Sequence, residues 1–229
     1  MPQFFEYGET EKIFLSKKDP QLGAAIKEIG HVYREVIPDL YAALVLQIIS
    51  QQISTKGAET VYSRLCDMLG PPTPQNICKT PVDKIQKCGM SMRKTQYIVD
   101  FSQSVINGAL DLQALHTLSD DELCAKLSGI RGIGVWTAEM LMTFSMCRPD
   151  IMSFGDIAIH RGLRMLYRHR KITPQLFSKY KRLYSPYASV ACLYLWEIAG
   201  GACKELHDHA PMTEAQKNAK RKQKRRLDK

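Results

Sequence analysis

Apolar residues along this chain recur every three or four positions, and this spacing predicts helices rather than strands. Clear examples run from Leu44 to Ile53, from Tyr97 to Val105 and from Val190 to Ile198. Such a repeat places the apolar side chains on one face of a helix. No convincing hairpin of alternating strands is present. We therefore expect an all-α protein of about ten helices with essentially no sheet.

Capping residues, prolines and glycines mark where these helices begin and end. A hydroxyl residue precedes proline at Thr73, Thr80, Thr173 and Ser185. Proline suits the first helical position, because it has no N–H to lose there, and the hydroxyl can cap the helix. The stretch Ser119–Glu122 forms a capping box. Asn107–Gly108 and Gly200–Gly201 are expected helix ends.

One internal loop is the best candidate for a domain boundary. Residues Cys147–Gly155 contain a proline and a glycine and show no helical repeat. We therefore expect two helical subdomains. Residues 39–149 form one, which is barrel-like, and residues 1–38 together with 150–210 form the other. Residues 211–229 form a basic tail that we expect to be disordered.

The charge of the chain is concentrated in that tail. The formal net charge is +9, and the run Lys217–Arg226 carries much of it. Such a run either keeps the protein in solution or adds salt-dependent attraction to phosphate. No apolar run is long enough to cross a bilayer, so no membrane partner is expected. The first residues lack the basic start of a signal peptide, which favours the cytoplasm, with attachment to the nucleoid in a bacterium.

The seven cysteines follow no metal-binding or disulfide pattern. None forms a C-x-x-C pair, which is typical of reduced thiols in an intracellular protein. Cys203, His207 and His209 lie close together, but they are too few to make a zinc site. We therefore expect no metal.

The stretch Gly129–Ala138 is the most informative in the chain. A helix ending near Leu127 and a helix starting near Trp136 are joined by very few residues, so the stretch predicts a tight hairpin. Glycines at 132 and 134 can adopt backbone angles closed to other residues. Isoleucines at 130 and 133 can anchor the hairpin to the core.

This hairpin predicts an anion site. The amides of Gly132, Gly134 and Val135, with Thr137 close behind, would point outward at the start of a helix. Amide donors and the positive end of the helix dipole together suit a phosphate, and such a contact carries no sequence information. The alternative is a plain corner between two helices, in which the glycines serve packing.

Together with Asp156 downstream, the string Leu127–Ala138 resembles the helix-hairpin-helix DNA glycosylases that carry a Gly/Pro-rich loop and an aspartate (HhH-GPD). The chain is most similar to their 3-methyladenine DNA glycosylase II branch. Three further segments share the resemblance: Leu46–Ser54, Arg148–Leu163 and Ser185–Gly200. The resemblance implies a monomeric base excision repair enzyme. Its partner is duplex DNA with a damaged base, most often an alkylated purine.

Asp156 occupies the position of the family's catalytic aspartate. A carboxylate near C1′ of a flipped nucleotide would stabilise oxocarbenium-like charge, and it could orient or deprotonate the attacking water. The simpler alternative is that Asp156 only caps the helix that follows it. The two roles are compatible, since capping would keep the carboxylate ionised.

Trp136 occupies the position of a lysine found in bifunctional members. That lysine forms a Schiff base and leads to strand cleavage. The resemblance therefore implies a monofunctional enzyme without lyase activity, since Lys126 falls on the other side of the hairpin. Some members hold an iron–sulfur cluster on four cysteines near the C-terminus, where this chain has only Cys192 and Cys203. We expect no iron–sulfur cluster and no other cofactor, although hairpin carbonyls could hold a monovalent cation.

The resemblance also suggests a base pocket and a wedge. Trp136 and Trp196 would stack on the flipped base, and an indole face suits a cationic alkylated purine. Tyr187 is a weaker candidate, and Met140 replaces an aromatic residue of the best-known branch. The two tryptophans could instead be core residues.

Gln52, and after it Ile53, would fill the hole that the flipped base leaves in the duplex. The alternative is that this segment is simply the polar end of a helix. Two other functions stay open. The chain could be a glycosylase for uracil, hypoxanthine or oxidised guanine, or a non-catalytic helix-hairpin-helix DNA-binding protein.

Overall fold

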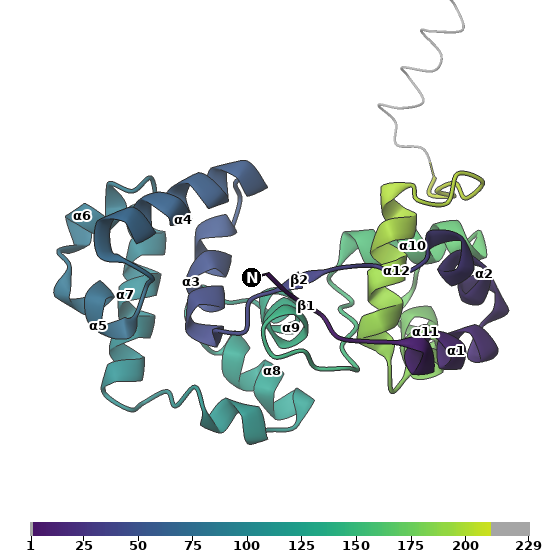
Figure 1. Ribbon diagram of the computed structural model, residues 1–229, viewed down its shortest axis with the longest axis horizontal. Helices are drawn as coiled ribbons and strands as arrows, with labels where there is room; N and C mark the ends of the chain where they lie inside the picture. The colour runs from purple at the N-terminus through teal and green to yellow at the C-terminus, as the bar shows by residue number, and fades with distance from the viewer. Residues whose placement is uncertain (1, 212–229) are drawn as a thin grey trace, which may run out of the picture. The chain divides into compact units, whose positions relative to one another are not determined.

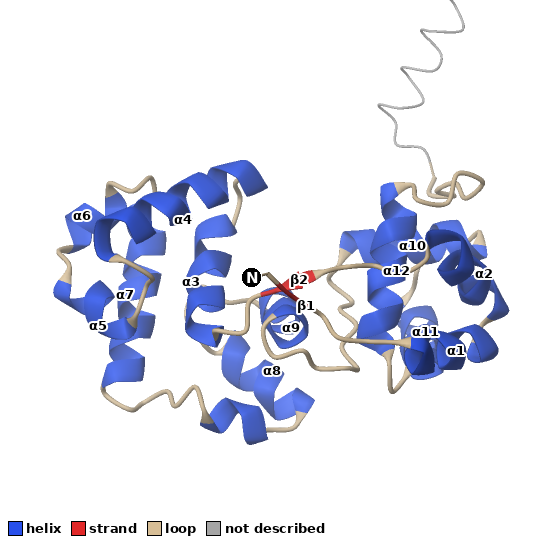
Figure 2. Cartoon of the chain, viewed as in Figure 1, coloured by secondary structure: helices blue, strands red, loops and turns tan. Residues whose placement is uncertain are grey.

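The computed structural model describes residues 2–211 of the chain. Within this range it contains twelve α-helices, one short 3-10 helix and a single two-stranded sheet (Figures 1 and 2). The all-α prediction is confirmed. The described residues contain more helices than the expected ten or so, because short segments such as α5 (Pro74–Lys79) and α6 (Val82–Gln86) form helices of their own. The basic run at 217–226 lies outside the described residues.

The chain divides into two compact units. The first contains the residues up to Gly8, Tyr33–Gly155 and Pro186–Ser189. Besides α5 and α6, its elements are β1 (Gln3–Phe4), β2 (Glu35–Val36), α3 (Leu40–Ser50), α4 (Thr55–Leu69), α7 (Met92–Ile106), the 3-10 helix η1 (Ala114–Thr117), α8 (Asp120–Ser128) and α9 (Val135–Phe144).

The second unit contains Glu9–Val32, Asp156–Ser185 and the residues from Val190 onward. Its elements are α1 (Glu9–Lys18), α2 (Pro20–Ile29), α10 (Ile157–Tyr167), α11 (Pro174–Tyr184) and most of α12 (Ala188–Gly200).

These bounds differ from the expected boundaries at 38/39 and 149/150. Strand β1 pairs antiparallel with β2, with Gln3 opposite Val36, and the amide of Ile37 donates to the carbonyl of Phe144 over 2.8 Å. These bonds place both strands in the first unit. Ser189 joins the same unit, because its Oγ accepts from the amide of Ile151 at 2.9 Å. The division therefore falls at the end of the predicted boundary loop, between Gly155 and Asp156.

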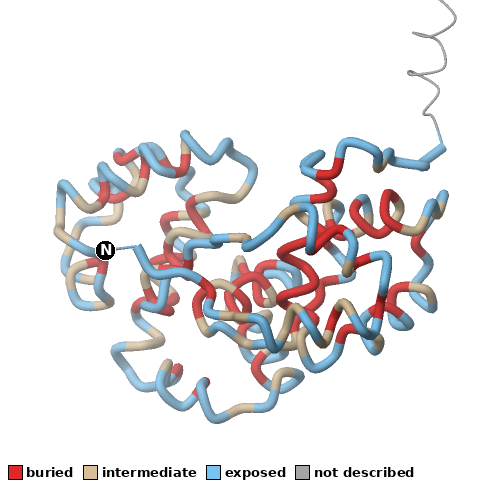
Figure 3. The backbone as a smooth tube through the Cα atoms, turned by 45° about the vertical axis from the view of Figure 1, so that its right-hand side comes forward, coloured by how far each residue is buried: buried red, intermediate tan, exposed pale blue. Residues whose placement is uncertain are grey.

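The core of the first unit is built around α3. Its side chains at Leu44, Val45 and Ile48 are fully buried. Helices α4, α7, α8 and α9 contribute buried residues to the same cluster, including Leu65, Ile98, Leu127 and Leu141. Buried and exposed positions alternate along most of these helices (Figure 3), as the apolar repeat predicts.

In the second unit two helices approach each other very closely. A Cβ on Gly162 of α10 would lie 2.4 Å from the carbonyl oxygen of Leu195 in α12. Only glycine permits this contact. The helix that begins after Asp156 is thus held directly against α12.

Two of the four predicted hydroxyl–proline starts form as expected. Thr73 and Thr173 cap α5 and α11 with their side chains. Thr80 does not cap, because α6 begins later, at Val82. Helix α12 begins at Ala188, whose amide donates instead to the carboxylate of Asp150 over 3.1 Å. Of the helices between residues 2 and 211, none has the length and apolar character to cross a membrane.

Candidate functional site

The predicted hairpin lies between α8 and α9. Helix α8 ends at Ser128, and α9 begins at Val135. Ile133 is buried, and Ile130 packs against the core of the first unit. The two isoleucines therefore anchor the loop as expected. Arg131 and Gly134, on either side of Ile133, are exposed.

The two hairpin glycines serve different purposes. Gly132 has φ +93°, and a Cβ there would lie 2.3 Å from Cδ2 of Tyr97. Gly134 has φ −90°, which any residue can adopt, and a Cβ there would meet nothing within 4 Å. The expectation of special backbone angles thus holds for Gly132 and is wrong for Gly134. At Gly134 the missing side chain leaves space in front of the start of α9.

The start of α9 has the geometry of an anion site. Its first intrahelical bond runs from the amide of Ala138 to the carbonyl of Gly134 over 2.9 Å, so the amides from Val135 to Thr137 precede it. Such amides and the helix dipole attract an anion. Thr137 is only 7% exposed, whereas Val135 is 58% exposed, so the first residue of α9 presents more surface to a ligand than Thr137 does.

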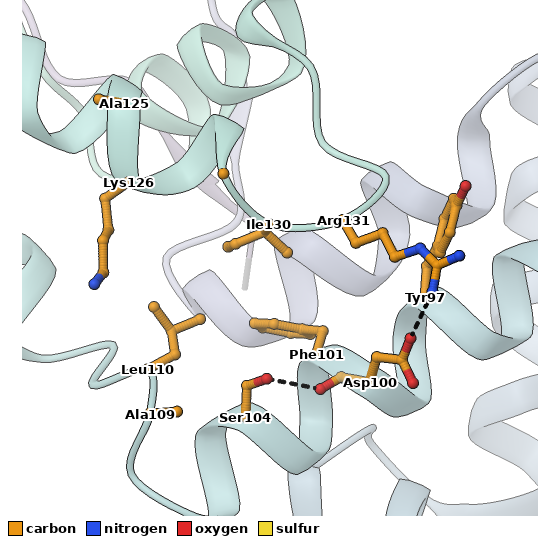
Figure 4. Close-up of a pocket in the computed structure, with 11 residues that line it drawn as sticks. Tyr97, Asp100, Phe101, Ser104, Ala109, Leu110, Ala125, Lys126, Ile130 and Arg131 are labelled. Atoms are coloured by element: carbon orange, nitrogen blue, oxygen red, sulfur yellow. Dashed lines mark hydrogen bonds and ion pairs between the residues drawn. The ribbon is translucent and has the colours of Figure 1, made fainter.

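A cavity of about 390 Å³ lies beside the hairpin, between α7 and the end of α8 (Figure 4). Tyr97, Asp100 and Arg131 line one side of it. The guanidinium of Arg131 lies over the ring of Tyr97, 5.4 Å from its centroid, and forms an ion pair with Asp100 at 3.5 Å. Arg131 is therefore held against α7. Lys126 lines the same cavity, in the last turn of α8.

The predicted wedge lies in a tightly held loop. Residues 51–54 connect α3 to α4, and we call them the wedge loop. Gln52 and Ile53 are exposed in it, and Gln52 has φ +59°, in the left-handed region. Since α3 ends at Ser50, neither residue is part of the helix end.

Two side chains hold the wedge loop. Nε2 of Gln51 donates to the carbonyl oxygen of Gly132 over 2.6 Å. Nζ of Lys94, in the first turn of α7, donates to the carbonyl oxygens of Ile49 and Gln51, at 2.8 and 2.5 Å. Sequence reasoning missed Lys94, because it lies more than forty residues from both acceptors and belongs to no motif.

Asp156 begins α10 as its N-cap. Its Oδ1 accepts from the amides of Ala158 and Ile159, each at 2.9 Å, and the residue is only 7% exposed. The expected cap is therefore present, and these two bonds fix the carboxylate in position. The loop that leads to it packs on α9, since a Cβ on Gly155 would lie 3.5 Å from Cβ of Trp136.

The candidate pocket residues are distributed over both units. Trp136, in the first turn of α9, is 45% exposed, so it is not a core residue. Met140, one turn later, is buried and lines a cavity of about 150 Å³. Tyr187 in the first unit and Trp196 in the second are half-buried. The first unit therefore carries the hairpin, the wedge loop, Trp136, Met140 and Tyr187, and the second carries Asp156 and Trp196.

Histidine, cysteine and acidic side chains of residues 2–211 do not gather in groups of three or more that could hold a metal ion. Cys203, from the weak zinc pattern, is buried, and burial raises the pKa of its thiol to about 11.

Comparisons with known proteins match most of the chain. Residues 45–186 match the family described as "HhH-GPD superfamily base excision DNA repair protein". The DNA-3-methyladenine glycosylase 1 of Schizosaccharomyces pombe is 32% identical over 164 residues, which cover 69% of this chain and 72% of the relative.

Two solved structures are also similar. One is a DNA-3-methyladenine glycosidase from Bacillus halodurans, with a TM-score of 0.80 and 32% identity, over 91% of this chain and 96% of that one. The other is a 3-methyladenine DNA glycosylase of S. pombe in complex with abasic DNA. Its TM-score is 0.72 at 30% identity, over 83% of this chain and 97% of that one.

Proposed function

Because the chain belongs to the HhH-GPD superfamily of base excision DNA repair proteins, we propose that it is a DNA glycosylase for alkylated purines in duplex DNA. The observation that carries this proposal is Asp156. Its carboxylate is fixed by two backbone amides at the start of α10, at the position of the family's catalytic aspartate. The relatives named as 3-methyladenine glycosylases support an alkylated base as the substrate.

In the proposed reaction the enzyme flips the damaged nucleotide out of the duplex and breaks the bond between C1′ and the base nitrogen. The carboxylate of Asp156 stabilises the positive charge that develops on the sugar, and it orients the attacking water. The oxygen of water adds to C1′ while the bond from C1′ to the base nitrogen breaks. The electron pair of that bond goes to the base and neutralises its positive charge, and the proton that water loses passes through the Asp156 carboxylate to solvent. The products are the free base and an abasic site.

The hairpin and the wedge loop supply the grip on DNA. Gly132, Gly134, Val135 and Thr137 would bind a backbone phosphate through their amides at the start of α9, and the space in front of Gly134 admits it. Gln52, with Ile53 beside it, would fill the gap in the duplex. Their exposure in the wedge loop supports this role.

The base pocket would use the indole of Trp136, whose exposure leaves it available for stacking. Tyr187, half-buried in the same unit, is the weaker candidate, and Trp196 and Met140 stay predictions of the resemblance. An aromatic face binds a cationic base more strongly than a neutral one, and this favours alkylated purines.

The remaining features of the proposal follow from the resemblance. Trp136 in place of a lysine makes the enzyme monofunctional, of the 3-methyladenine glycosylase II type. It works as a monomer without an iron–sulfur cluster or another cofactor, except that hairpin carbonyls could hold a monovalent cation. The cytoplasm, or the nucleoid of a bacterium, is its proposed location.

A panel of lesions tests the function. The wild-type protein is incubated with a duplex methylated by dimethyl sulfate and with duplexes that carry uracil, hypoxanthine or oxidised guanine, and the free bases are measured. We expect release of methylated purines. Release from another duplex alone would assign a different lesion. Binding of every duplex without release would leave a non-catalytic DNA-binding protein.

A further inference from the structure

We propose that Lys94 is a positioning residue of this glycosylase, which holds the wedge loop in the conformation that presents Gln52 to the duplex. This inference rests on the proposed function. Lys94 acts on how the gap in the duplex is filled, whereas Asp156 acts on the breaking of the bond between C1′ and the base.

The position of Lys94 in its own helix is unfavourable. It lies in the first turn of α7, where the helix dipole favours acidic side chains. Its ammonium group reaches instead to the end of α3 and donates to the carbonyls of Ile49 and Gln51. Those carbonyls have no partner within α3, and the negative end of the α3 dipole attracts the cation. Lys94 thus serves the wedge loop and not its own helix.

This contact also has a cost for Lys94. The side chain is half-buried, and burial, with the neighbouring Arg93, lowers the pKa of its amine. With two of its three N–H donors committed to these carbonyls, the ammonium is a poor phosphate ligand.

The wedge loop needs such support because it is strained. Gln52 has φ +59°, a region that costs a residue with a side chain about 1 kcal/mol. Within the loop the amide of Ile53 makes only a long bond, of 3.4 Å, to the carbonyl of Ser50. The strained conformation therefore depends on bonds from outside the loop, which come from Lys94 and from the Gln51 contact with Gly132.

The same face of α7 supports the hairpin. Lys94 and Tyr97 are three residues apart and so share that face. Tyr97 contacts Gly132 and lies under Arg131 (Figure 4). One turn of α7 thus holds both the wedge loop and the phosphate-binding hairpin. Their spacing is set before DNA binds, so a hairpin bound to a phosphate places Gln52 at a defined depth.

The test separates wedge insertion from catalysis. The Lys94→Met variant keeps the length of the side chain and removes its charge and donors. Lys84→Met, at an exposed lysine of α6, is the matched control for lost charge. Lys94→Arg is the conservative variant. Each protein is saturated with a duplex that holds a stable abasic analogue beside 2-aminopurine, whose fluorescence rises when it unstacks.

We expect the wild type, Lys84→Met and Lys94→Arg to raise this fluorescence and Lys94→Met to lose at least half of the rise. Base release provides the second readout. Lys94→Met should release base from a fully paired duplex at least about tenfold more slowly, and within about twofold of wild type when the lesion lies opposite an abasic site, where flipping is easier.

An equal loss of base release on both duplexes, or an unchanged fluorescence rise in Lys94→Met, would overturn the proposal. A wild type that raises the fluorescence but releases no base would overturn the proposed function and leave the role of Lys94 standing. If Lys94→Met does not fold, Gln51→Met removes the bond to Gly132, and the same fluorescence loss is expected.

Discussion

Gly132 lies so close to the ring of Tyr97 that a Cβ on the glycine would come within 2.3 Å of Cδ2. The backbone there is also left-handed, with φ +93°. Both the contact and the angle require glycine. Two residues later Gly134 has neither constraint. Gly132 therefore serves packing, whereas Gly134 leaves the start of α9 accessible.

Replacing Gly132 with alanine should therefore destabilise the protein. The added methyl group overlaps the ring of Tyr97 and strains the backbone, and together these effects should lower the free energy of unfolding by about 2 kcal/mol or more. Urea denaturation followed by circular dichroism measures the loss.

Gly134→Ser is the matched control for this prediction. Serine is a good N-cap, so stability should stay within about 0.5 kcal/mol of wild type. Its side chain would occupy the space in front of the α9 amides, and affinity for undamaged duplex should fall several-fold. If Gly134→Ser binds DNA as tightly as wild type, the phosphate does not approach there.

Substitutions of Asp156 should separate its capping role from catalysis. Asparagine caps a helix about as well as aspartate, so Asp156→Asn should keep its stability, whereas Asp156→Ala should lose about 1 kcal/mol. Both remove the charge opposite the developing cation and should slow single-turnover base release about 100-fold or more. A release rate near wild type in Asp156→Asn would refute the catalytic assignment.

The proposed absence of lyase activity has a direct chemical test. Without a lysine at the position of Trp136, no Schiff base should form with the abasic sugar. Borohydride should trap no covalent protein–DNA adduct during base release, and strands should break only after alkali treatment. A trapped adduct, mapped by mass spectrometry to a lysine, would contradict the prediction.

An ion pair on α10 predicts a dependence of stability on pH. Arg164 donates from Nε and Nη2 to the two carboxylate oxygens of Asp208, each at 2.7 Å, and these bonds lower the pKa of Asp208. A lowered pKa stabilises the fold above the ordinary pKa, and this contribution is lost as the pH falls through the lowered value.

Asp208→Asn should therefore cost about 1 kcal/mol near neutral pH. The difference from wild type should shrink as the pH falls through the ordinary pKa of an aspartate, about 3.9, and further below it, where Asp208 takes up a proton in both states. Urea denaturation of both proteins across this range measures it. A difference that does not change with pH would mean that the charge on Asp208 contributes nothing.

Local patterns in the sequence predicted much of this protein. The apolar repeat identified the helices, because a helix with one buried face requires it. The caps at Thr73 and Thr173 depend on neighbouring residues alone, and the glycines of the hairpin mark its turn in the sequence. The motif shared by the hairpin and Asp156 predicted the superfamily, and the family match confirms it.

The tertiary structure decided what local patterns could not. At the start of α12 the amide of Ala188 donates to Asp150, which lies far away in the sequence. Arg131 is paired with Asp100, and Lys94 reaches the carbonyls of Ile49 and Gln51 across more than forty residues. A sequence shows which residues can donate or accept a hydrogen bond, but the partner is set by which helices pack together, and that depends on the whole core.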